Sequence, residues 1–335
     1  MSLIDHCAFN GDADGLCALQ QLRLAGELDA GVKLVSGVKR DIDLLRRVQA
    51  GAGERVTVLD ISHAQNHADT RRLLEAGAAL RYFDHHHAGE LPTHAAFESF
   101  IDTAADVCTS ILVDRYLDGR FHRWAVAAAF GDGLAGPARA LAQRHDLAAD
   151  DVTALEELGL LLNYNAYGES LADLHFDPQV LAAELLPYEN PLEFIRDSPS
   201  FTTLRAAHAT DMAAAQGQSP WRKGPGALLY RLPTEAWARR VSGVLANQLA
   251  SREPQRAIGL LSAKAEGGWL FSLRVPAGAA LAADAFCRGF PTGGGRARAA
   301  GINHLDDDQL DELASRLLAS YPQQAAQAAT LEASA

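Results

Sequence analysis

The stretch Ala79-Leu80-Arg81-Tyr82-Phe83-Asp84-His85-His86-His87 joins a short apolar run to one carboxylate and three imidazoles. The apolar run is typical of a buried strand, and imidazole together with carboxylate suits a divalent transition metal such as Mn, Fe, Co or Zn. Open α/β sheets hold their ligands at the carboxyl ends of their strands. The stretch therefore predicts a metal site at the exit of a strand. Taken alone, it is equally compatible with a solvated polar turn.

Predicted strands and helices alternate along the first part of the chain. Strands are predicted at 3–9, 32–37, 55–62 and 79–83, and helices at 16–24, 41–49 and 66–76. This alternation favours a doubly wound parallel sheet. The near-continuous apolar run at 55–62 fits a parallel strand that is buried on both faces.

Acidic residues follow these predicted elements. Asp12 and Asp14 lie in a glycine-rich turn after the first strand, Asp60 lies near the end of the third, and Asp132 stands between two glycines after a predicted helix at 124–130. A buried carboxylate is costly unless it is paired or bound to a metal. For single motifs, simpler interpretations are an Asx turn at Asp12 and a helix C-cap turn at Asp132. A calcium loop is less favoured, because its later acidic ligands are missing.

The pattern changes from residue 226 onward. Strands predicted at 227–232, 257–262 and 269–275, with a helix at 237–249, indicate a smaller α/β domain. The run Gly293-Gly294-Gly295 lets backbone N–H groups approach an anion, and Arg296 can add a bidentate phosphate contact. A flexible loop with a solvated arginine is the alternative. We expect a metal-binding domain at 1–175, a helical connector at 176–222, a substrate-binding domain at 223–322, a flexible tail at 323–335, and an active-site cleft between the two domains.

Composition restricts the function. Hydrophobic residues make up 48% of the 335 residues and charged residues 21%, as in a globular protein with a core. The net charge of −12 argues against a protein that coats long nucleic acid, although bound metals can supply positive charge for a short anionic substrate. No signal peptide or membrane span is expected. The four cysteines show no CxxC pair, which favours a reducing, cytoplasmic location.

Five motifs occur in a recognisable order: 9–15 (Phe-Asn-Gly-Asp-Ala-Asp-Gly), 59–62 (Leu-Asp-Ile-Ser), 84–86 (Asp-His-His), 131–133 (Gly-Asp-Gly) and 293–301 (Gly-Gly-Gly-Arg-Ala-Arg-Ala-Ala-Gly). In this order the chain resembles the DHH phosphoesterase superfamily with its DHH-associated C-terminal domain, and in particular its oligonucleotide phosphodiesterases. The resemblance extends from about residue 3 to about residue 320.

The resemblance implies two divalent metal ions, usually Mn²⁺. Their ligands would be Asn10, Asp12, Asp14, Asp60, His85 and Asp132. Asp12 would serve the first ion and Asp14 the second, with Asp60 between them and His85 and Asp132 completing the second site. The catalytic residues would be Asp60, Asp84 and His86, with Asp84 orienting His85 and His86 facing the substrate phosphate. The second domain would hold the rest of the substrate through Arg274, Gly293, Gly294, Gly295, Arg296 and His304.

Three positions depart from the family pattern. Ala8 stands where many members have a histidine, and Asn10 stands where others have an aspartate. An asparagine ligates through a neutral oxygen and brings no charge to the first metal. Arg296 stands where a histidine usually follows the three glycines, and His304 is a candidate for that role.

The expected activity is hydrolysis of short 5′-phosphorylated oligonucleotides or linear dinucleotides to mononucleotides, by two-metal activation of a water. One alternative is an inorganic polyphosphate or pyrophosphate hydrolase. A second is a non-catalytic nucleotide-binding regulator, suggested by Ala8 and Asn10. Hydride transfer is disfavoured because the first turn lacks a GxGxxG fingerprint. The expected partner is a short nucleotide, without long duplex nucleic acid or membrane, and a homodimer is left open.

Overall fold

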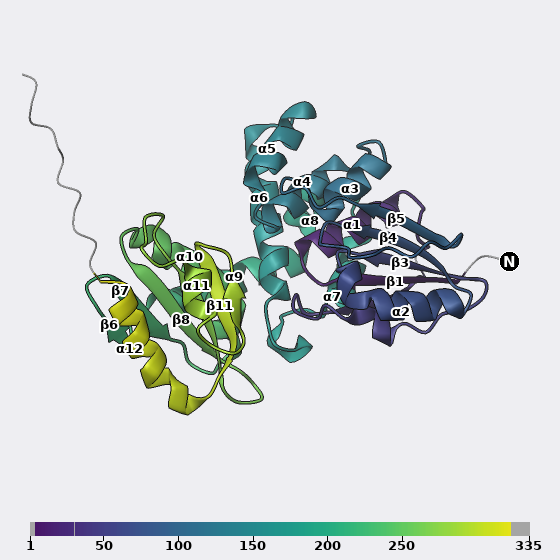
Figure 1. The fold of residues 1–335 in the computed structure, drawn as a ribbon. Helices are drawn as coiled ribbons and strands as arrows, with labels where there is room; N and C mark the ends of the chain where they lie inside the picture. Colours follow the sequence, from purple (N-terminus) through teal and green to yellow (C-terminus); the bar gives the residue numbers. More distant parts are fainter. Residues whose placement is uncertain (1–3, 30, 323–335) are drawn as a thin grey trace, which may run out of the picture. The chain divides into compact units, whose positions relative to one another are not determined.

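The computed structural model describes residues 4–29 and 31–322. It divides into two compact units, residues 1–209 and residues 210–335 (Figure 1). The tail predicted at 323–335 lies outside the described residues. Within the described part of the chain, no helix is long and apolar enough to cross a membrane.

A five-stranded parallel sheet forms the centre of the first unit, in the order β2-β1-β3-β4-β5. The strands are β1 (Ile4–Asn10), β2 (Lys33–Gly37), β3 (Glu54–Leu59), β4 (Ala79–Asp84) and β5 (Phe97–Ile101). Since β1 lies between β2 and β3, the chain winds away from β1 in both directions. The exits of β1 and β3 therefore form the topological switch point, where open sheets of this kind bind their ligands.

Helices cover both faces of this sheet. Alternate residues of a strand point to opposite faces, so Cys7 and Phe9 join one apolar cluster while Ala8 between them joins another. The first cluster includes residues of α1 (Ala13–Leu24) and of the helices after β5, and the second includes residues of α2 (His63–Glu75). Figure 1 shows α2 and α3 on opposite sides of the strands. The predicted doubly wound α/β fold is confirmed.

The helix predicted at 41–49 is wrong. In its place the structure has only a short 3₁₀ helix, η1 (Leu44–Arg47). The guanidinium of Arg47 binds the carboxylate of Asp41 at 2.8 Å, and Val48 is already extended. Leu44 and Leu45 are fully buried, so the apolar residues that suggested a helix pack against the sheet from a tight turn.

Helices follow the sheet up to the end of the first unit. They are α3 (Thr109–Tyr116), α4 (His122–Gly131), α5 (Ala135–Arg144), α6 (Ala149–Ala166), η2 (Leu171–Asp173), α7 (Pro178–Leu185), α8 (Pro191–Asp197) and α9 (Pro199–Gln216), which crosses the boundary at residue 209. Helices α7 and α8 each begin at a proline after a capping side chain, Asp177 and Asn190. Leu181, Phe194 and Phe201 lie in the core of the first unit. The segment predicted as a connector is therefore packed into this unit as far as residue 209.

The second unit is built on a six-stranded mixed sheet in the order β10-β11-β9-β8-β7-β6. Its elements are β6 (Arg222–Lys223), β7 (Ala227–Arg231), α10 (Ala236–Arg252), β8 (Ala257–Ala263), β9 (Trp269–Arg274), α11 (Ala283–Cys287), β10 (Gly293–Gly295), β11 (Ala299–Leu305), η3 (Asp307–Gln309) and α12 (Leu310–Ser320). Only β7 and β8 are parallel neighbours. The predicted smaller α/β domain is confirmed.

The three-glycine run is an edge strand rather than a loop. Gly293 to Gly295 pair with β11 as β10, and Arg296 and Ala299 close the hairpin by exchanging both backbone hydrogen bonds. A Cβ on Gly293 would lie 1.7 Å from the carbonyl oxygen of Cys287. Gly295 has a φ of 143°, which disfavours a side chain. Gly293 is thus required by close packing and Gly295 by backbone conformation.

Candidate metal centre

The turn after β1 carries Asp12 and Asp14 into the switch point. Asp12 is the N-cap of α1: its Oδ1 accepts from the N–H of Asp14 at 3.0 Å and of Gly15 at 3.2 Å. Its Oδ2 is bound by the ammonium of Lys39, which follows β2. Burial raises the pKa of Asp12, but the charge and hydrogen bond of Lys39, with the two N–H groups, lower it below its usual value. Asp12 is therefore an ionised and fully engaged carboxylate.

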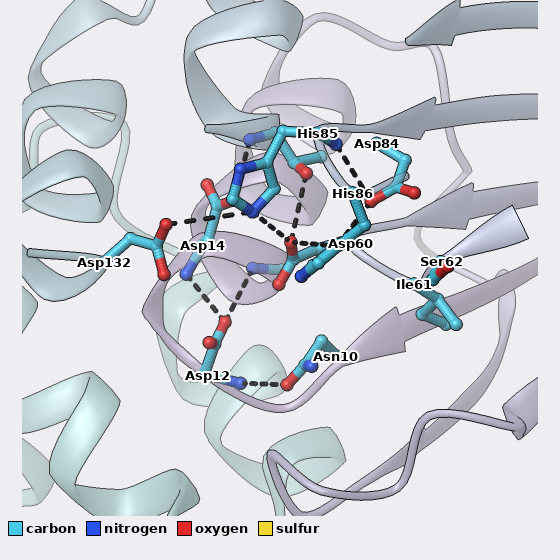
Figure 2. A network of polar contacts seen from close by, with 12 residues as sticks. Asn10, Asp12, Asp14, Asp60, Ile61, Ser62, Asp84, His85, His86 and Asp132 are labelled. Atoms are coloured by element: carbon cyan, nitrogen blue, oxygen red, sulfur yellow. Dashed lines mark hydrogen bonds and ion pairs between the residues drawn. The ribbon is translucent and has the colours of Figure 1, made fainter. Parts of the chain in front are cut away.

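Asn10 has a different role from the one predicted. Its Oδ1 accepts from the N–H of Asp12 at 3.3 Å, and its Nδ2 donates to the carbonyl oxygen of Lys39 at 3.3 Å. Figure 2 shows the Asn10 amide turned toward the backbone of Asp12. Both ends of the amide are used to hold the turn, so in this structure Asn10 is a positioning residue rather than a free ligand.

Asp14 is completely buried and is held by the amino end of α3. Its Oδ2 accepts from the N–H of Thr109 and its Oδ1 from the N–H of Ser110, both at 2.7 Å. The hydroxyl of Ser110 donates to the carbonyl oxygen of Asp14 at 2.9 Å. These donors carry the partial positive charge of a helix N-terminus. These N–H groups offset the cost of burying the charged carboxylate of Asp14 and fix its orientation.

Asp60 lies at the exit of β3 in a left-handed backbone conformation, with a φ of 59°. Such conformations in residues other than glycine persist where surrounding contacts enforce them, and they cluster at functional sites. The N–H of Asp60 donates to the carbonyl oxygen of Phe83 at 3.0 Å, and its Oδ1 accepts from the hydroxyl of Thr109 at 3.2 Å. Burial and the charges of Asp12 and Asp14 raise the pKa of Asp60 well above its usual range. The site therefore lacks positive charge at this carboxylate.

The Asp-His-His motif begins with the last residue of β4. The Nε2 of His85 lies 3.4 Å from Asp60, 3.7 Å from Asp132 and 4.0 Å from Asp14, so this imidazole points into the carboxylates. His86 is more open, with 46% of its side chain exposed. Figure 2 shows both rings beside Asp60.

The role predicted for Asp84 changes. The prediction has it orienting the imidazole of His85, but its Oδ1 accepts from the backbone N–H of His85 at 2.9 Å and contacts Nδ1 of His86 at 2.8 Å. This hydrogen bond raises the pKa of His86, against the opposing effect of burial. Asp84 is fully buried, and its Oδ2 has no partner among the described residues. In the structure it orients His86.

Asp132 comes from α4, which ends at Gly131. A Cβ on Gly131 would lie 2.4 Å from the Cβ of Ala13 and 2.7 Å from the carbonyl oxygen of Gly159. The glycine therefore lets the end of α4 approach α1 closely and brings Asp132 opposite Asp14, as Figure 2 shows. Burial and the charge of Asp14, opposed mainly by Lys39, raise the pKa of Asp132 to about 6.

These side chains fit one divalent cation. Ligand atoms of Asp14, His85 and Asp132 lie within 4.8 Å of one another, and so do those of Asp60, His85 and His86. Imidazole with carboxylate suits Mn, Fe, Co or Zn. The raised pKa values of Asp60 and Asp132 show uncompensated negative charge that such a cation would neutralise. The donor set and its charge both match a transition metal.

Apart from His86, the residues predicted to bind substrate lie in the second unit, and they do not all lie close together. Arg274 pairs with Ala299, which pairs with Arg296, so these three residues form a row across the sheet. The guanidinium of Arg274 donates to Oδ1 of Asn247 at 2.8 Å, while Arg296 is exposed. His304 lies near the opposite end of β11 and contacts Asp306 at 3.2 Å. Five residues of a strand span roughly 17 Å, so His304 does not join the arginine row.

Sequence reasoning missed four polar residues of the site: Lys39, Thr109, Ser110 and Asn163. Lys39 follows the predicted strand at 32–37, so its place at a strand exit was a usable signal. Ser110 lies in the first turn of α3. Nothing in the sequence indicates that the start of this helix meets Asp14, because that contact spans about 95 residues.

Comparison with known proteins agrees with this geometry. Residues 225–321 match the family model of the DHHA1 domain. The manganese-bound exonuclease RecJ superposes with a TM-score of 0.58 at 18% identity, over 96% of this chain and 91% of RecJ. The chain therefore has the fold of RecJ, and its second unit contains a match to the DHHA1 domain. This confirms the resemblance identified from the sequence.

Two further solved structures share the DHH fold. The pGpG-specific phosphodiesterase PggH from Vibrio cholerae has a TM-score of 0.59 at 15% identity, over 94% of this chain and 99% of PggH. RecJ of Thermus thermophilus in complex with Mn²⁺ has a TM-score of 0.55 at 18% identity, over 95% of this chain and 52% of that one. No curated protein sequence matches the chain significantly.

Proposed function

We propose that the chain is a metal-dependent phosphodiesterase that hydrolyses short 5′-phosphorylated oligonucleotides or linear dinucleotides to mononucleotides. The observation that carries the proposal is the convergence of Asp14, Asp60, His85 and Asp132, from four separate elements, at one switch point. The DHH fold supports the reaction class, since RecJ is an exonuclease and PggH a phosphodiesterase.

In this proposal Asp14, His85 and Asp132 hold the metal, with Asp60 beside them. Manganese is the first choice, because RecJ structures contain it and the donors suit it. When bound, the metal supplies a Lewis acid for a phosphoryl oxygen and lowers the pKa of a water.

The other residues position and neutralise. Asp84 holds the imidazole of His86 by Nδ1, which leaves Nε2 available as a donor to a phosphate oxygen. The raised pKa of His86 favours its protonated form, which suits an anion. The hydroxyl of Thr109 donates to the carboxylate of Asp60 and fixes its orientation, while the backbone of Asp60 is held in a left-handed conformation. The chain thus provides a preorganised acceptor site for a phosphodiester.

A short substrate is favoured over a long one. The net charge of −12 opposes binding of long nucleic acid. In the second unit, the row of Arg274, Ala299 and Arg296 offers two guanidinium groups at one end of β9 and β11, enough for one or two phosphates of a small ligand. All four cysteines are buried as free thiols; a reducing, cytoplasmic setting remains part of the proposal.

A substrate panel in Mn²⁺ tests the proposal. It contains 5′-phosphorylated dinucleotides, longer oligonucleotides, cyclic dinucleotides and polyphosphate. Asp60→Ala removes the buried carboxylate, and Asp106→Ala is the control, since Asp106 is exposed. We expect fast release of mononucleotides from dinucleotides by the wild type and Asp106→Ala, and none by Asp60→Ala. Phosphate release from polyphosphate alone would favour the polyphosphatase, and tight nucleotide binding without turnover would favour the regulator.

A further inference from the structure

The DHH resemblance implies two metal ions, but the residues of the first ion do not fit one. Ala8, where many members have a histidine, is fully buried in an apolar cluster. Both ends of the Asn10 amide form hydrogen bonds with backbone groups. Asp12 remains as the one carboxylate that would serve the first ion alone, since Asp60 would lie between the two ions, and Oδ1 of Asp12 caps a helix.

Lys39 binds the second carboxylate oxygen of Asp12, the one that does not cap the helix. Its Nζ binds Oδ2 of Asp12, donates to Oδ1 of Asn163 at 3.1 Å, and lies 3.7 Å from Oδ1 of Asp132. The Lys39 side chain is 25% exposed, and its Nζ also lies 5.8 Å from the centre of the Tyr167 ring. The side-chain oxygens of Asp12, Asn163 and Asp132 are ligands of the kind that a hard cation would take. The ammonium group of Lys39 lies among them instead.

The backbone of Lys39 is held as firmly as its side chain. Its N–H donates to the carbonyl oxygen of Ala166 at 3.0 Å, and its carbonyl oxygen accepts from Nδ2 of Asn10 at 3.3 Å. An aspartate at position 10 would set a carboxylate oxygen against that carbonyl, whereas the amide of asparagine donates to it. The departure at Asn10 and the placement of Lys39 are thus parts of one arrangement.

The remaining candidate ligands fit a single ion. The two candidate groups of ligands, Asp14 with His85 and Asp132, and Asp60 with His85 and His86, share His85. The Nε2 of His85 is the ring nitrogen that faces the carboxylates, and one nitrogen lone pair binds one ion. The two groups are therefore overlapping parts of one site.

We propose that Lys39 replaces the first metal ion, so that the centre binds one divalent cation and uses the Lys39 ammonium as its second positive charge. The ammonium neutralises Asp12 and partly offsets the charge of Asp132, which the first ion would otherwise do. The inference concerns the site of the proposed phosphodiesterase and rests on that function only for its catalytic meaning, because ion number is measured without substrate.

The test is the number of manganese ions bound by the purified full chain. After loading with excess Mn²⁺ and desalting, we expect one ion per chain by elemental analysis, and the hyperfine-resolved EPR signal of isolated Mn(II). Two ions per chain, or the signal of an exchange-coupled pair, would overturn the proposal. So would the absence of any bound ion. The wild-type protein alone thus decides the ion number.

Paired variants test whether Lys39 is the cause. Asn10→Asp with Lys39→Ala restores a carboxylate and removes the ammonium, so the double variant should bind a second ion and show a coupled signal. Lys33→Ala is the matched control, since Lys33 begins β2 at its other end and its side chain is 60% exposed; it should keep one ion. A folded double variant that still binds one ion would contradict the role given to Lys39. If the double variant does not fold, Lys39→Met is measured instead. An unchanged number of bound Mn²⁺ ions with an unchanged affinity would count against the proposal.

Hydrolysis measured on the same samples separates the two proposals. One ion without turnover of any phosphoester would end the proposed function and leave the ion count standing. Two ions with turnover of dinucleotides would do the reverse.

Discussion

Asp114 makes a specific prediction about stability, because its carboxyl group is buried in the middle of α3. It is 4% exposed, and its Oδ1 has no partner among the described residues. Burial, opposed by the charges of Arg144 and Arg115, raises the pKa of Asp114 from 3.8 to about 6. The raised pKa means that the folded chain binds this proton more tightly than the unfolded chain does.

The stability of the folded chain depends on pH because the Asp114 carboxyl group has a different pKa in the folded and unfolded states. At a pH below about 4 the group is protonated in both states and costs nothing. The penalty grows as the pH rises from about 4 to about 6, and it is complete above that range. A shift of about two pKa units corresponds to about 3 kcal/mol of lost stability, which is an upper figure because charge burial relaxes.

Asp114→Asn removes this ionisation and should stabilise the first unit at pH 8 by up to about 3 kcal/mol, or roughly 2–4 °C in Tm for each kcal/mol. The gain should vanish near pH 4. Urea and thermal unfolding are followed by circular dichroism in EDTA, so that metal binding does not contribute. Asp106→Asn, at an exposed position before the same helix, should change little. A gain that is equal at pH 4 and pH 8, or no gain at pH 8, would refute the reasoning.

Three further predictions concern the metal centre and the substrate. Thr109→Val removes the hydroxyl that donates to Asp60 at 3.2 Å but keeps the backbone N–H groups; Mn²⁺ affinity by calorimetry should fall about tenfold, and an unchanged affinity would contradict this. Asp84→Asn weakens the hold on His86 and should lower kcat roughly tenfold with little change in Mn²⁺ affinity; a loss of metal instead would make Asp84 a ligand. Arg274→Ala should raise KM for a dinucleotide more than it lowers kcat, and equal effects on both would place Arg274 in the reaction itself.

The fold and the exits of the strands could be predicted because they depend on local patterns. The buried run before Asp60 and the apolar strand before Asp84 each end in a carboxylate. In a parallel sheet such ends meet at one edge. That geometric rule is sufficient to expect Asp14, Asp60 and His85 near one another, and the structure brings them together.

Contacts distant in sequence could not be predicted in the same way. Lys39 reaches Asp12 only because β2 lies beside β1, and strand order is not written in any local pattern. Asp84 binds the imidazole of His86 rather than that of His85 because of the way the chain turns after β4, and a local pattern does not reveal that turn. The glycine run was expected to let backbone N–H groups approach an anion, with a flexible loop as the alternative; the structure pairs it with β11 as an edge strand, in a hairpin closed by Arg296.

An anomalous difference map at the manganese edge, from crystals grown with Mn²⁺, tests the central claim most directly. The account predicts one strong peak bounded by Asp14, His85 and Asp132, with the Lys39 ammonium still on Asp12. A pair of peaks with Lys39 displaced would contradict the single-ion centre. No peak among these residues would contradict the metal centre itself, and with it the proposed phosphodiesterase.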